Sequence, residues 1–144
     1  MLFIIIASTT YFIVYMSKRI GGTILEALAI SAGMLFLMFQ FMPSAVQGLY
    51  WFNGAVNYGL FHGLLLLLIC CMVEIQGDIV FKKRIILTIL GAFLAFLVVG
   101  GNHTTALMGT VFPVLVTGYD IVFKKHKNYI SNLIIMIVAV IGLM

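Results

Sequence analysis

A stretch rich in aromatic and amide side chains carries the residue types best suited to hold a ligand. It follows Pro43 and contains Trp51, Asn53, Asn57, Tyr58 and the nearby His62. Neutral amides both donate to and accept from hydroxyl groups, and aromatic ring faces cover apolar C–H patches, so this set suits a sugar. The competing interpretation is an aromatic belt, because Trp and Tyr concentrate at membrane–water interfaces.

A second polar group lies in the short segment after Gly100 and Gly101, where Asn102 and His103 come together. His103 can carry a proton or a hydrogen bond near pH 7. Thr104 offers an alternative, purely local role as the N-cap of the helix that follows. Neither segment contains a carboxylate. We therefore expect no metal ion and no cofactor here, and the catalytic residues stay unknown.

The composition places these segments in a membrane protein. The chain has 144 residues, of which 64% are hydrophobic and 8% charged, with a mean hydropathy of +1.24. A soluble domain carries about a quarter charged residues, and one of this size could not hide so much apolar surface. This composition excludes a soluble enzyme, a nucleic-acid-binding module and a disordered tail. The expected partner is the lipid bilayer, with no nucleic acid.

The expected fold class is all-α, a polytopic transmembrane helical bundle of about six spans in one transmembrane region, residues 1–144. Crossing the hydrocarbon takes roughly 20 residues. The charge-poor runs are residues 2–16, 24–42, 58–73, 85–99, 104–122 and 129–144. Because the first and last runs have no polar cap, we expect a piece of a longer membrane protein.

The basic residues predict the orientation of these spans. All eight fall after the first, third and fifth runs: Lys18, Arg19, Lys82, Lys83, Arg84, Lys124, Lys125 and Lys127. Basic loops stay in the cytoplasm, so both chain ends and both aromatic or amide segments lie outside. The expected location is a bacterial inner or plasma membrane, crossed several times.

The acidic residues lie near the same cytoplasmic ends. Glu26 lies about two turns after Arg19 and Asp120 one turn before Lys124, so local pairing is expected. A carboxylate inside a membrane is a candidate functional group, but each of these can reach the interface, so the structural interpretation is favoured.

The two outer segments resemble a known family. A W-x-x-G-x-x-N-Y pattern runs from Trp51 to Tyr58, and a G-N-H element ends at His103 after a hydrophobic span. This arrangement resembles bacterial polytopic membrane proteins of unassigned function that are related to GT-C-type membrane glycosyltransferases and to glucosyltransferases of surface polysaccharide. The resemblance covers roughly residues 43–105.

The resemblance implies transfer of a sugar from a polyprenyl-phosphate donor to a cell-envelope glycan on the outer face. Such proteins usually carry acidic residues in an external loop near their first helix, and we expect that base upstream of residue 1 or missing. Two alternatives stay open. One is a transporter or channel subunit that uses a fifth span kinked at Pro113. The other is a non-catalytic structural membrane protein.

Overall fold

The structure is a computed structural model that describes residues 2–41, 55–123 and 126–143, without the side chains of residues 55, 57, 58 and 126–128. Every regular element in these ranges is helical, which confirms the all-α prediction for the described residues. The chain divides into two compact parts, Met1–Leu66 and Leu67–Met144. Each part is described by itself.

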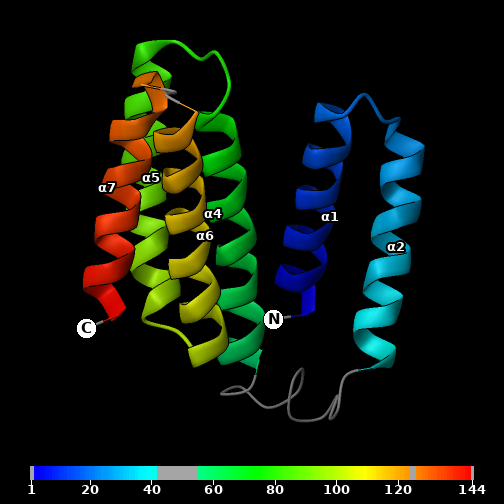
Figure 1. Cartoon of the computed structure of the whole chain (residues 1–144). Helices are drawn as coiled ribbons and strands as arrows, with labels where there is room; N and C mark the ends of the chain where they lie inside the picture. Colours follow the sequence, from blue (N-terminus) through cyan, green and yellow to red (C-terminus); the bar gives the residue numbers. More distant parts are fainter. Residues whose placement is uncertain (1, 42–54, 124–125, 144) are drawn as a thin grey trace. The chain divides into compact units, whose positions relative to one another are not determined.

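The first part is a hairpin of two helices, α1 (Leu2–Arg19) and α2 (Ile24–Gln40) (Figure 1). Gly21 makes the turn possible because its φ of 84° is strained for residues with a side chain. Thr23 then begins α2 with a reciprocal cap: its hydroxyl accepts from the Glu26 N–H at 3.3 Å, and its N–H donates to Glu26 Oε2 at 2.8 Å. A π-helical turn, η2 (Ala55–Leu60), packs against α1 where a Cβ on Gly59 would lie 2.9 Å from Ile5 Cδ1.

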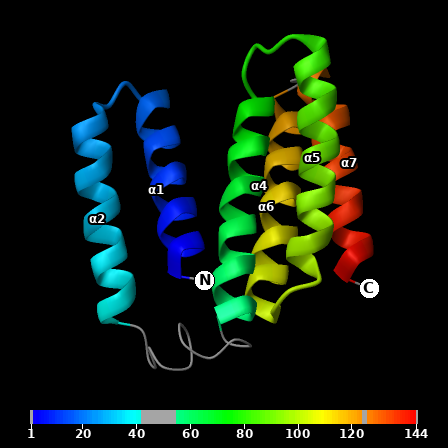
Figure 2. The ribbon, with the colours of Figure 1, turned by 180° about the vertical axis from the view of Figure 1, so that it is seen from behind.

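The second part packs three long helices around one another. Helix α4 (Phe61–Ile75) leads into α5 (Phe81–Val99), α6 (His103–Val122) and α7 (His126–Leu143). Each of α5, α6 and α7 contacts the other two, and consecutive helices run in opposite directions (Figures 1 and 2). The C-terminal ends of α4 and α6 therefore meet the N-terminal ends of α5 and α7.

Two glycines allow the closest helix contacts in this second part. A Cβ on Gly109 of α6 would lie 2.6 Å from Val98 Cγ1 of α5, and one on Gly91 of α5 would lie 2.7 Å from Ile135 Cδ1 of α7. Both distances are below van der Waals contact. These helix pairs therefore pack backbone to side chain, the mode that small residues permit at helix interfaces.

The helices follow the predicted runs with shifted ends: α2 stops at Gln40, short of the expected residue 42, and α4 begins at Phe61, after the expected residue 58, whereas other helices extend beyond their runs. Lys18 and Arg19 lie inside α1, and Lys82, Lys83 and Arg84 lie inside α5, because a helix can continue past the apolar run into its basic flank. By length and composition alone, α6 is the one helix within the described ranges that is long and apolar enough to cross a membrane.

Polar and apolar side chains are distributed unusually in the second part. Large apolar side chains point outward, as in Ile89, Leu115 and Ile130, which are 66%, 65% and 65% exposed. Apolar side chains such as Leu94, Val98 and Ile135 fill much of the interior, but polar side chains are buried there too: Thr88, Thr105, Thr117, Asp120, Ser131 and Asn132. Scattered apolar residues on a surface are ordinary, but a buried polar group is informative.

Candidate functional site

The residues expected to hold a sugar are only partly within the described ranges. Trp51 and Asn53 lie outside them, and Asn57 and Tyr58 belong to η2 without described side chains. His62 is half-buried in the first turn of α4. The clustering of these residues stays a prediction.

The segment before α6 has a local structural role. Asn102 is the N-cap of α6: its Oδ1 accepts a hydrogen bond from the Thr105 N–H at 3.0 Å. The expectation that Thr104 caps this helix was wrong by two positions, since Thr104 lies within α6. His103 is exposed at the first position of α6. Its imidazole is therefore open to a ligand from outside the helix.

A buried carboxylate stands at the opposite end of α6. The Asp120 side chain is 1% exposed, and it accepts hydrogen bonds from two amides on neighbouring segments. Gln76 Nε2, just past α4, lies 3.0 Å from Oδ1 and 3.1 Å from Oδ2, and Asn132 Nδ2 of α7 donates to Oδ2. Whether Asp120 lies at a membrane interface stays a prediction. Its pairing with Lys124 lies outside the described residues.

Two further buried oxygens belong to the same neighbourhood. Thr117 lies one turn before Asp120 on the same face of α6 and is 1% exposed, and Asn132 is 0% exposed. Among the described residues, neither Thr117 Oγ1 nor Asn132 Oδ1 has a hydrogen-bond partner. We call Gln76, Thr117, Asp120 and Asn132 the Asp120 cluster. A buried polar atom without a partner is costly, and each such atom asks for an explanation.

The other carboxylates near the basic ends differ from Asp120 in their surroundings. Glu74 Oε1 pairs with Lys83 Nζ at 2.7 Å, and the two side chains are 23% and 56% exposed. Glu26 caps α2, as described above, in place of the expected local role beside Arg19. Both are therefore surface groups, which leaves the Asp120 cluster as the deepest charged site that the described residues contain.

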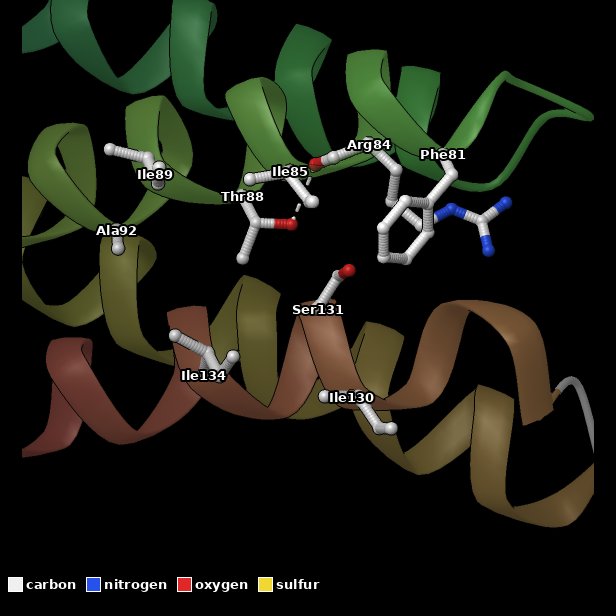
Figure 3. A pocket seen from close by; sticks show the side chains of 9 residues that line it. All are labelled: Phe81, Arg84, Ile85, Thr88, Ile89, Ala92, Ile130, Ser131 and Ile134. Atoms are coloured by element: carbon white, nitrogen blue, oxygen red, sulfur yellow. Dashed lines mark hydrogen bonds between the residues drawn. The ribbon is translucent and has the colours of Figure 1, made fainter.

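An apolar groove lies between α5 and α7. It has a volume of about 530 Å³ and is lined by one stripe of α5 from Phe81 to Ala92 and by three residues of α7. Figure 3 shows the Ser131 hydroxyl turned toward α5, and the Arg84 guanidinium at one end beside Phe81. Because its walls are mainly apolar side chains, four of them isoleucine, the groove suits an alkyl chain and not a polar substrate.

Sequence reasoning missed the Asp120 cluster as a site. Its partners lie 44 and 12 positions away from Asp120, so no spacing rule connects them. The one usable signal was that Asn132 interrupts an otherwise apolar run. Within the described residues, no group of three or more His, Cys, Asp and Glu side chains is arranged to hold a metal ion.

Comparison with protein-family models, with curated proteins and with solved structures gives no match to this chain. Its function is therefore argued from its own residues.

Proposed function

We propose that the chain is a multi-pass membrane protein of six spans, with its basic connections in the cytoplasm and both ends outside. The observation that supports this most is that α5, α6 and α7 present many large apolar side chains at their surface and also bury polar ones, Thr117, Asp120 and Asn132 among them. Lipid is the solvent that makes such a surface favourable, and intramembrane polar groups turn toward the bundle interior.

The charge pattern of the second part agrees with this proposal. In α5 the basic residues occupy only the first turn, and the rest of the helix, from Ile85 to Val99, carries no charge. Helices shorter than the hydrocarbon layer can still cross it if they stand close to the bilayer normal and the bilayer thins around them. This mismatch costs a modest free energy per ångström.

The proposal of membrane insertion is tested by extraction. Membranes from cells that express the chain are washed with alkaline carbonate and then with detergent. The chain should stay in the pellet through carbonate and enter solution only with detergent, because its outward surface is apolar. A monodisperse chain in the carbonate supernatant would overturn the proposal.

For the activity, we propose that the chain contributes to transfer of a sugar from a polyprenyl-phosphate donor to a cell-envelope glycan on the outer face. The support is the likeness of residues 51–58 and 100–103 to GT-C-type enzymes, together with the exposure of His103 at the end of α6 that would face outward. Trp51 would stack on a sugar ring, and Asn57 and His103 would bond hydroxyl or phosphate oxygens.

This activity is tested with Trp51→Phe, Asn57→Ala and His103→Ala, by measuring surface-glycan modification against the amount of inserted protein. Losing a hydrogen bond to a charged group should lower transfer roughly ten- to a hundredfold. Tyr119→Phe is the control, since Tyr119 is a half-exposed aromatic at the other end of α6. If all three variants modify glycan normally at normal protein level, these residues are an aromatic belt and the sugar site is wrong.

A second candidate function, passage of a solute through the bundle, is favoured by one observation. Asp120 is a carboxylate held inside the helices by amides, as in proton and ion pathways of transporters. The two functions can be distinguished by how each responds to a substitution. Sugar transfer should fail with His103→Ala and survive Asp120→Asn, whereas uptake into proteoliposomes should show the reverse pattern.

A further inference from the structure

We propose that the Asp120 cluster binds a monovalent metal cation, for which sodium is the probe. The proposal goes beyond sugar transfer and does not depend on it, because the cluster is formed entirely by α6, α7 and the end of α4. It requires only that these segments pack as the structure shows them.

The charge of the cluster is the first argument. Asp120 is 1% exposed, and the two donors recorded for its carboxylate are neutral amides. Among the described residues its hydrogen-bond partners are therefore uncharged, and they lower the cost of burying the carboxylate without neutralising its charge. A buried charge is stable when it is paired or coordinates a metal. One bound cation would remove the net charge.

The unpartnered oxygens are the second argument. Thr117 Oγ1 and Asn132 Oδ1 are buried and have no hydrogen-bond partner among the described residues. Thr117 shares a helix face with Asp120, and the Asn132 amide already touches the carboxylate. Both atoms therefore belong to residues that neighbour Asp120, and neither has a hydrogen-bond donor within the described part of the chain. Hard cations prefer such hydroxyl, amide and carboxylate oxygens as ligands.

The composition of the cluster selects the charge of the ion. A calcium site normally gathers several carboxylates, and a zinc site needs His, Cys or carboxylate ligands in a tetrahedral set. Here a single carboxylate stands among neutral oxygens. One negative charge balances one positive charge, so a monovalent ion fits and a divalent ion would leave excess positive charge buried.

The amides give the cluster a way to exist with and without the ion. An Asn or Gln side chain presents N–H donors on one side and a carbonyl oxygen on the other. Without the ion, Asn132 and Gln76 donate to Asp120, as the structure shows. With the ion, a half-turn of the Asn132 amide would place its oxygen on the cation, and the cation would replace the Nδ2 donor at the Asp120 carboxylate.

The experiment measures thermal unfolding of the purified full chain in detergent while sodium chloride replaces choline chloride at constant ionic strength. Choline is too large to be bound among the four side chains of the Asp120 cluster. The unfolding midpoint should rise with sodium and saturate, because an ion that binds only the folded chain stabilises it. Equal midpoints in sodium and choline would overturn the proposal, and a midpoint that responds to pH but not to sodium would assign the cluster to a proton.

Variants make the test specific to the cluster. Thr117→Val removes one proposed ligand without removing a hydrogen bond, and it should raise the apparent sodium dissociation constant about tenfold. Asp120→Asn should abolish the sodium-dependent shift. Thr9→Val is the matched control, since the Thr9 hydroxyl in α1 is also buried and without a partner among the described residues. If Thr117→Val and Thr9→Val both respond to sodium like the native chain, the proposal is wrong.

Discussion

The two ends of α6 use polar side chains in different ways. At its start, the Asn102 side chain caps the helix by accepting a hydrogen bond from the Thr105 N–H, three residues later. His103, the next residue, is exposed. At its other end, Asp120 is buried and bonded to Gln76 and Asn132 on other segments. At the first end, the side-chain hydrogen bond that caps the helix joins two residues of the same segment. The second contains one carboxylate that connects three parts of the chain.

Because of this difference, the two ends of α6 should contribute unequally to the stability of the bundle. A cap on an exposed helix end competes with water, so its loss costs little more than one hydrogen bond. A buried carboxylate leaves its partners without water when it is removed, so its loss carries their desolvation as well. We therefore expect substitutions at the Asp120 end of α6 to lower the stability of the bundle more than substitutions at the Asn102 end.

The largest expected effect is at the buried end. Asp120→Leu removes the acceptor for both amides, and each amide left unsatisfied should cost about 1–3 kcal/mol. The midpoint of unfolding in detergent should therefore fall far more for this variant than for any change at Asn102. A midpoint unchanged from the native chain would mean that the cluster does not hold these segments together.

The glycines of the helix contacts give the next effect. Gly109→Ala would place a methyl 2.6 Å from the stiff Val98 side chain and should destabilise by about 1–3 kcal/mol. Gly118 lies on the same helix with nothing within 4 Å of an added Cβ, so Gly118→Ala should be neutral or stabilise by up to about 1 kcal/mol. Equal destabilisation by both substitutions would contradict the close packing of α5 and α6.

These same residues show how much the sequence could predict. Hydrophobic runs and basic flanks predicted the helices well, because both signals are local and continuous along the chain. The role of Asp120 could not be predicted, since its partners come from segments whose packing depends on contacts such as Gly109 with Val98. Asn102 is an intermediate case. The sequence identified it as a candidate ligand-binding residue but did not predict that it caps α6.

The start of α6 should respond more weakly. Asn102→Ala removes the N-cap and should lower stability by about 0.5–2 kcal/mol, whereas Asn102→Asp keeps an acceptor for the Thr105 N–H and should stay close to native. Thermal unfolding of the two variants side by side measures the difference. A larger loss for Asn102→Ala than for Asp120→Leu would reverse the proposed contrast between the two ends.

The smallest effect is expected at the exposed ion pair. Lys83→Ala breaks the contact with Glu74, but both side chains are solvated, so stability should fall by only about 0.2–1 kcal/mol and less at high salt. Comparing unfolding at low and high ionic strength checks this. A loss as large as that of Asp120→Leu would show that Lys83 is held in a buried network.

The central claim is that the two ends of α6 and its neighbours lie on opposite sides of a membrane. In a chain whose Cys70 and Cys71 are replaced by Ala, single cysteines at His103 and Lys83 can be labelled with a thiol reagent that does not cross membranes. We predict that His103→Cys reacts in intact cells and that Lys83→Cys reacts only after permeabilisation. Equal labelling of both positions in intact cells would contradict the claim.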